Sequence, residues 1–173
     1  AGVVMQDERR VDALMVETKA GRQAVRARIF IDCSGDGDLA AWAGAPFEIG
    51  DDHGHTLYPS MMFRLNGIDP EKAGEAWRTI PTLMEKAEAA GTHKSPRKGA
   101  IVRPQKSGIE WRANFTQVAR EDGKAINGIE PDDLTRGEID GRRQVAAAFE
   151  FLRTVPGFEK SYIVDLPPQL GIR

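Results

Sequence analysis

Residues 32–38, Asp-Cys-Ser-Gly-Asp-Gly-Asp, concentrate three carboxylates and two glycines in one short segment. The spacing D-x-S-x-D-G matches the first part of an EF-hand calcium loop, in which oxygen ligands alternate before a sharp glycine turn. Such a loop also needs a bidentate acid at its twelfth position, where this sequence has Ala43, and a helix leading into it. The preceding residues 29–31, Ile-Phe-Ile, favour a strand instead. We therefore expect no calcium at this segment.

A strand–turn–helix connection is the second interpretation of the same residues. Glycines at the end of a buried strand allow backbone N–H groups to approach a ligand, and the start of the following helix favours phosphate. Residues 35–38, Gly-Asp-Gly-Asp, are not a complete dinucleotide fingerprint, and carboxylates would repel a pyrophosphate. The residues alone leave two interpretations open, a turn beside a nucleotide and a tight turn without a ligand.

Two histidines, His53 and His55, follow Asp51 and Asp52 and form a second candidate site. Two close ligands without a clear third are too few for a zinc site, so we expect no metal here. An exposed polar loop is the default interpretation. Beside a cofactor, either imidazole is also a candidate for binding an anionic substrate.

Arg64 and Arg173 join His53 and His55 as candidate catalytic residues. A guanidinium group binds a carboxylate or phosphate through paired N–H groups, and a structural salt bridge is an equally good interpretation of each arginine. Cys33 has no identifiable activating base in the sequence, so a buried, unreactive thiol is favoured over a nucleophile.

Turn signals and periodicity predict the elements that position these residues. Residues 11–18 and 23–31 are predicted strands of a hairpin, the second of which becomes fully apolar toward its end. Residues 38–44 are predicted to form a short helix with acidic residues at its N-terminus.

Further along, residues 57–65 predict a strand and residues 69–71, Asp-Pro-Glu, predict a helix start. We expect Pro81 to interrupt that helix, a capping box at residues 82–85 to restart it, and Gly91 to end it.

Residues 110–119 predict another strand, and residues 131–152 predict the longest helix. Gly137 and Gly141 lie four residues apart in that helix and each lowers its intrinsic stability by about 1 kcal/mol. Their presence is explained if another element approaches the helix closely.

Composition limits the classes of function. With 24 basic and 26 acidic residues the net charge is −2, which gives no indication of a nucleic-acid or membrane partner. No apolar run approaches the length of a membrane helix. The single cysteine, Cys33, excludes an internal disulfide. We expect a cytoplasmic protein in a reducing compartment.

Residues 29–50, IFIDCSGDGDLAAWAGAPFEIG, resemble an internal segment of bacterial FAD-dependent oxidoreductases, a group related to the fumarate reductase and succinate dehydrogenase flavoproteins. The family segment is usually written ID-A-T-G-D-G-D-L-A-A-x-A-G-A. The resemblance continues in residues 57–69, LYPSMMFRLNGID, and in three shorter segments, DLTRGEIDGRRQ, FLRTVPGFE and PPQLGIR. Residues 71–112 match the family weakly.

The resemblance implies that Cys33-Ser34-Gly35 occupies the family's Ala-Thr-Gly turn beside FAD, where small residues allow contact through the backbone. Asp36 and Asp38 are then expected to cap the helix. The implied activity is redox chemistry on a small organic substrate, with the flavin carrying a hydride or electron pair. The implied cofactor-binding residues are Cys33, Ser34, Gly35, Asp36, Gly37 and Asp38.

The family's N-terminal G-x-G-x-x-G loop and C-terminal flavin segment have no counterpart in this sequence. The resemblance therefore implies an internal part of a larger flavoprotein. Residues 1–45 are expected to contribute a hairpin and a strand–turn–helix to the FAD domain, and residues 46–173 to form the substrate or cap domain. The expected fold is α+β, mainly an antiparallel sheet with packed helices.

FAD is expected in the full-length parent and not on this chain alone, which is expected to be inactive. The alternative function is a non-catalytic binding or interaction domain with the same fold. Since residues 29–31 are too apolar for an exposed edge, the isolated chain is also expected to form a homo-oligomer through them or to rearrange around them.

Overall fold

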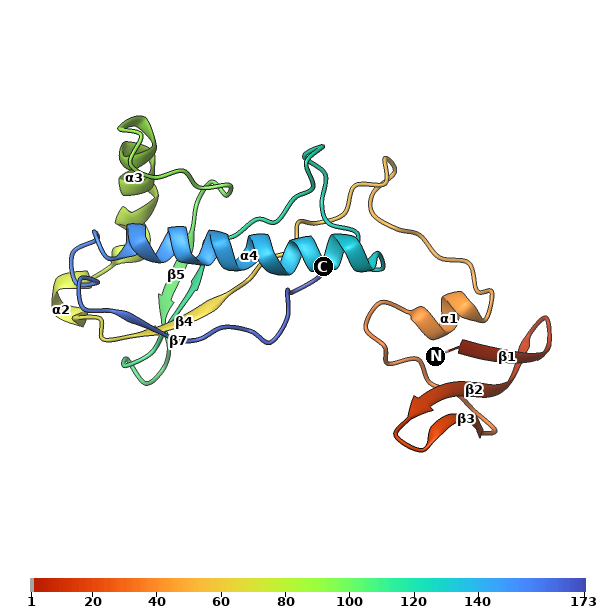
Figure 1. Ribbon diagram of the computed structural model, residues 1–173. Coiled ribbons are helices and arrows are strands. Elements are labelled where there is room, and N and C mark those ends of the chain that lie inside the picture. The colour runs from red at the N-terminus through yellow and green to blue at the C-terminus, as the bar shows by residue number, and fades with distance from the viewer. Residues whose placement is uncertain (1) are drawn as a thin grey trace. The chain divides into compact units, whose positions relative to one another are not determined.

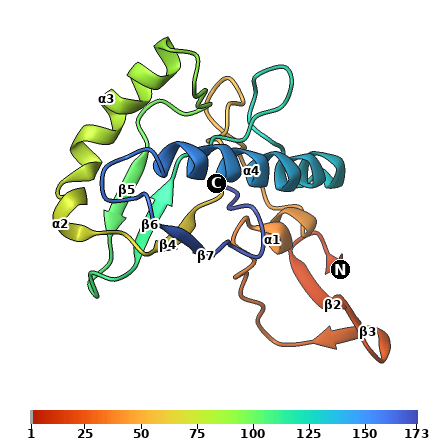
Figure 2. The same ribbon diagram turned by 60° about the vertical axis from the view of Figure 1, so that its left-hand side comes forward.

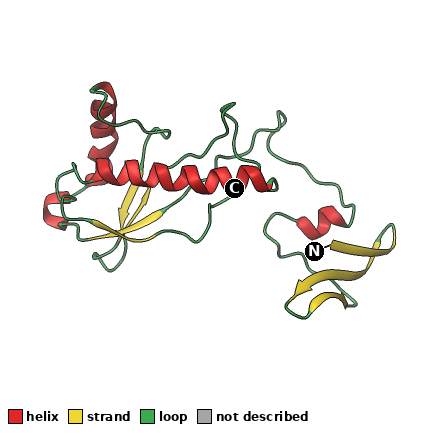
Figure 3. Cartoon of the chain, in the orientation of Figure 1, coloured by secondary structure: helices red, strands yellow, loops and turns green. Residues whose placement is uncertain are grey.

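The computed structural model describes residues 2–173. The chain forms two compact units, Ala1–Ile49 and Gly50–Arg173, each with its own sheet. Figure 3 shows the helices and strands of each unit in different colours from the loops that connect them. Both sheets are antiparallel and helices accompany them, which confirms the expected α+β class.

The first unit is a three-stranded sheet with the order β1-β2-β3, followed by a short helix (Figure 1). Its elements are β1 (Gly2–Asp7), β2 (Arg10–Thr18), β3 (Gly21–Arg26) and α1 (Asp38–Trp42). The predicted hairpin is confirmed, because β2 and β3 pair from Thr18 opposite Gly21 to Ala13 opposite Arg26.

The predicted buried strand at residues 29–31 is wrong. β3 ends at Arg26, and the following residues form no strand. The side chains of Ile29 and Ile31 are 78% and 79% exposed. An apolar composition favours burial, but a strand also needs a neighbour for its backbone groups, and no strand in residues 2–173 pairs with this segment.

The second unit contains a four-stranded antiparallel sheet with the order β5-β6-β4-β7. Its strands are β4 (Phe63–Asn66), β5 (Ile101–Pro104), β6 (Trp111–Asn114) and β7 (Tyr162–Asp165). Its helices are α2 (Pro70–Ala73), α3 (Ala76–Ala89) and α4 (Pro131–Leu152). The long helix α4 runs across one face of this sheet in both Figure 1 and Figure 2.

The predicted helix start at Asp69 is confirmed. The Asp69 side chain accepts hydrogen bonds from the N–H groups of Glu71 and Lys72, each at 3.2 Å. The predicted interruption at Pro81 is wrong, because α3 continues through it and the break lies earlier, at Gly74. A proline inside a helix costs about 3 kcal/mol. Burial of Ile80 and Met84 on the core-facing side of α3 offsets this cost.

The glycines of α4 do permit a close approach. A methyl group at Gly137 would lie 2.7 Å from Cδ2 of Leu170, and one at Gly141 would lie 3.2 Å from Cε of Met61. The segments around Met61 and Leu170 therefore lie directly against the α4 backbone.

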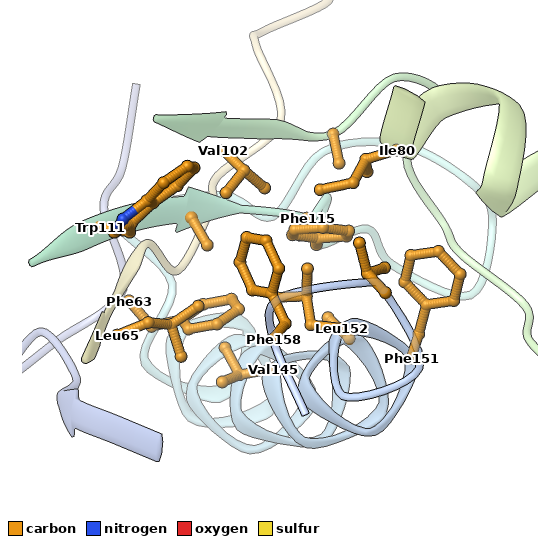
Figure 4. Close-up of a cluster of buried hydrophobic side chains, with 14 of the residues drawn as sticks. Phe63, Leu65, Ile80, Val102, Trp111, Phe115, Val145, Phe151, Leu152 and Phe158 are labelled. Atoms are coloured by element: carbon orange, nitrogen blue, oxygen red, sulfur yellow. The ribbon is translucent and has the colours of Figure 1, made fainter. Parts of the chain in front are cut away.

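Large side chains from the sheet, α4 and the segment after α4 form the core of the second unit (Figure 4). Trp111 and Phe158 meet edge to face at 5.5 Å between ring centroids, and Phe63 lies 6.3 Å from Phe115. Each fully buried side chain of this size contributes about 1.5–3 kcal/mol. No helix in the part of the chain that the structure describes has the length and apolar character needed to cross a bilayer.

Candidate functional site

Asp32 and Ser34 organise the turn before α1. One carboxylate oxygen of Asp32 accepts the N–H of Ser34 at 2.9 Å and its hydroxyl at 2.7 Å. The other carboxylate oxygen accepts the N–H of Ala40 at 2.9 Å. The Ser34 hydroxyl oxygen accepts the N–H of Asp38 at 2.9 Å. The N–H groups at the start of α1 thus find their partners in residues that precede the glycines.

The expectation that Asp36 and Asp38 cap the helix is therefore wrong. Gly37 occupies the N-cap position and no side chain caps it there. Asp32 reaches the helix instead, because its position before the turn places its carboxylate over the first N–H groups. These hydrogen bonds, chiefly the one from the Ser34 N–H, hold the pKa of Asp32 below its usual value.

The outer face of this turn is open. Gly35 and Gly37 have φ angles of 98° and 75°, in the region that favours glycine, and nothing lies within 4 Å of a methyl group at either position. Within residues 2–173, no protein acceptor takes up the N–H groups of Gly35, Asp36 or Gly37. The residues present therefore fit a cofactor that is held through the backbone.

Cys33 is exposed beside these glycines, so the expectation of a buried thiol is wrong. Residues 29–33 lack the strand that would have covered it. A small exposed side chain at this position leaves the approach to the turn unobstructed.

His53 and His55 lie in a turn organised by Asp51. One oxygen of Asp51 accepts the N–H groups of His53 and His55, each at 2.9 Å. The other lies 3.4 Å from Nδ1 of His55. These hydrogen bonds, chiefly the one from the His55 N–H, lower the pKa of Asp51. The two imidazoles are exposed and their centroids are 5.9 Å apart, so their proposed role with an anionic substrate stays a prediction.

The absence of a metal at either candidate segment also stays a prediction. Among residues 2–173, the structure brings together no group of three or more histidine, cysteine or acidic side chains able to hold a metal ion.

Arg64 joins two carboxylates. Its Nη1 lies 3.2 Å from Oε1 of Glu110 and its Nη2 lies 2.7 Å from Oδ2 of Asp165. The hydrogen bond to Asp165, followed by the charge of Glu110, raises the pKa of Arg64. Both terminal nitrogens of Arg64 pair with carboxylates, which favours a structural salt bridge over a substrate-binding role.

Arg173 has a different environment, because its Nη2 donates to the hydroxyl oxygen of Ser60 at 3.0 Å and no carboxylate of the described residues pairs with it. Asn114 Nδ2 donates to the same oxygen at 3.4 Å. Ser60 thus accepts two N–H donors and retains its own O–H to donate. A backbone pair between Ser60 and Gly171, with both hydrogen bonds at 3.1 Å, fixes this arrangement.

Ser60 and Asn114 were not predicted as site residues. Both are buried, and Oδ1 of Asn114 has no partner among the described residues. Their link to Arg173 spans 113 residues from Ser60, so no local spacing in the sequence indicates it. The arrangement suits an oxyanion, which would receive N–H groups from the guanidinium and a hydroxyl from Ser60.

The sequence was compared with known protein families, curated proteins and solved structures. A model of the FAD dependent oxidoreductase family matches residues 1–173. Neither the curated proteins nor the solved structures gave a match. Because the family match spans the whole sequence, the chain belongs to the FAD-dependent oxidoreductase family.

Proposed function

We propose that this chain is the internal, substrate-facing part of an FAD-dependent oxidoreductase related to the fumarate reductase and succinate dehydrogenase flavoproteins. The observation that carries the proposal is the turn at residues 33–38. Hydrogen bonds of Asp32 and Ser34 fix its conformation, and its outer face is open, with backbone N–H groups available to a ligand. The family match supports the choice of FAD as the ligand.

In this proposal the cofactor contacts the turn through the N–H groups of Gly35, Asp36 and Gly37, and Cys33, Ser34 and Asp38 border it. The carboxylates of Asp36 and Asp38 would repel the pyrophosphate but accept hydrogen bonds from hydroxyl groups. The hydroxyl-bearing part of FAD therefore suits this turn best. When bound, FAD supplies hydride or electron-pair transfer.

For the substrate, we propose a small organic molecule that carries a carboxylate. Arg173 holds it through the N–H groups that do not contact Ser60, and the Ser60 hydroxyl donates to the same group. Arg64 takes no part, because Glu110 and Asp165 engage it.

Protection of Cys33 tests the flavin contact. The protein is expressed at the full length that its gene encodes, and alkylation of Cys33 by N-ethylmaleimide is followed by peptide mass spectrometry with and without bound FAD. We expect FAD to slow the reaction about tenfold or more, because a ligand over the turn blocks the exposed thiol.

A cysteine introduced at the hairpin turn, Lys19→Cys, is the control and should react at the same rate in both states. Equal alkylation of Cys33 with and without FAD would contradict the proposed contact. A full-length protein that neither retains nor takes up flavin would favour a non-catalytic domain.

A further inference from the structure

A cavity of about 200 Å³ lies in the second unit between residues 93–96 and the C-terminal half of α4. Phe115 and Ala148, which are 1% and 2% exposed, contribute to its wall. The small side chain of Ala147, which is exposed on α4, leaves room beside them. The cavity is therefore lined mainly by apolar surface and is too small for a dinucleotide.

Specific contacts hold the walls in place. The side chain of Gln144 accepts the N–H of Gln117 at 2.9 Å and donates to its carbonyl oxygen at 3.1 Å. The ring of His93 stacks on Phe151 with 4.7 Å between centroids. Burial lowers the pKa of His93, while the charge of Glu88 acts in the opposite direction. These contacts fix the walls of the cavity, and burial disfavours a positive charge on His93.

Two cations border this apolar space, Lys94 and Arg143. No salt bridge within the described residues involves Lys94. Arg143 lies 3.2 Å from one oxygen of Asp140, but its side chain is 77% exposed and keeps N–H groups available. An apolar pocket with basic groups beside it matches a ligand with an apolar body and one anionic group.

We propose that this cavity binds a small aromatic monocarboxylate, with its ring against the exposed Pro96 and Ala147, beside the buried Phe115 and Ala148, and its carboxylate near Lys94 and Arg143. The ring matches aromatic and aliphatic walls, and the single negative charge matches the basic border. This site involves no residue of the turn at residues 32–40 and does not depend on the proposed flavin function.

Benzoate is the probe, titrated into the 173-residue chain and followed by amide chemical shifts in NMR. We expect saturable shifts at residues 93–96 and along the facing turn of α4. The exposed residue Ala147 offers a variant that fills the cavity, and Ala147→Trp should weaken benzoate binding about tenfold or more. Ala146→Trp is the matched control, because Ala146 is exposed on the same helix and does not line the cavity, and it should leave binding unchanged.

The charge requirement is tested separately. Lys94→Gln should weaken benzoate binding about two- to fivefold, as expected for one exposed charge pair. Lys98→Gln, a nearby exposed lysine outside the cavity, should have no effect. Absence of saturable benzoate shifts, equal effects of the two tryptophan variants, or benzamide binding as tightly as benzoate would overturn the proposal.

Discussion

Gly137 on α4 and Leu170 in the C-terminal segment lie so close that a methyl group on Gly137 would stand 2.7 Å from Cδ2 of Leu170. Leu170 is 3% exposed, so it has little space in which to move. The helix propensity of glycine is poor, but here its missing side chain is what allows the two segments to pack.

Gly137→Ala should therefore destabilise the protein, although alanine is the better helix former. Overpacking costs about 1–3 kcal/mol and the propensity gain returns about 1 kcal/mol, so we expect a loss of about 1 kcal/mol. Urea unfolding measures it. Gly141→Ala should cost less, since its nearest neighbour, Cε of Met61, lies farther away at 3.2 Å. A Gly137→Ala variant more stable than the parent chain would contradict the close packing.

Asp32→Asn should loosen the start of α1, because an amide accepts fewer hydrogen bonds than the carboxylate that serves Ser34 and Ala40. We expect faster amide hydrogen exchange at Ala40 in the variant. Asp36→Asn is the control, since no described N–H group donates to Asp36, and it should leave exchange at Ala40 unchanged.

The same carboxylate predicts a pH dependence. The pKa of Asp32 is lowered in the folded chain. The carboxylate therefore stabilises the start of α1 at pH values above the pKa that Asp32 has in the unfolded chain, about 3.9. The effect is lost as the pH falls through the lower, folded pKa. In the parent chain, the protection factor of the Ala40 amide against hydrogen exchange should fall over the same pH range. A protection factor that does not change with pH would contradict this prediction.

Thr116→Val tests a buried hydrogen bond. The Thr116 hydroxyl accepts the N–H of Met61 at 2.6 Å and donates to its carbonyl oxygen at 3.2 Å, and the residue is 1% exposed. Valine has the same shape but leaves the Met61 groups unpaired, which costs about 1–3 kcal/mol. Thermal unfolding should show a clearly lower unfolding temperature for Thr116→Val. Thr116→Ser keeps the hydroxyl and removes only the methyl group, so it should keep both hydrogen bonds to Met61, and a valine variant as stable as the parent chain would contradict the prediction.

The 173-residue chain alone should not bind FAD. Its turn offers only a few backbone donors, each worth about 0.5–1.5 kcal/mol net, against an association cost of about 4–15 kcal/mol. Titration with the chain should leave the fluorescence of FAD unchanged. A yellow preparation with stoichiometric flavin would show that these residues contain a complete cofactor site.

Ile29 and Ile31 should cause the isolated chain to self-associate, because both side chains are largely exposed. Light scattering should show a mass that rises with concentration. The double variant Ile29→Thr/Ile31→Thr should remain monomeric, whereas Ile109→Thr, at another exposed isoleucine, should behave like the parent chain. A parent chain that stays monomeric at high concentration would contradict this expectation.

Local features of the fold were predictable from the sequence. The hairpin at residues 10–26, the cap at Asp69 and the long helix α4 each depend on neighbours within a few positions, and the structure confirms them. The α+β class was expected from the family resemblance, and the structure confirms it. The family resemblance rested on ordered motifs, and the match over residues 1–173 confirms the family.

Tertiary structure decided which side chains meet. Pro81 stays within α3 because the helix buries Ile80 and Met84, a gain that local propensity does not include. Arg64 and Arg173 are both arginines, and the sequence offered the same two interpretations for each. In the structure Arg64 pairs with Glu110 and Asp165, whereas Arg173 donates to Ser60. Periodicity and spacing predict helices, strands and turns because those depend on adjacent residues. The partners of a charged or polar side chain depend on chain segments far apart in sequence, so only the folded structure determines them.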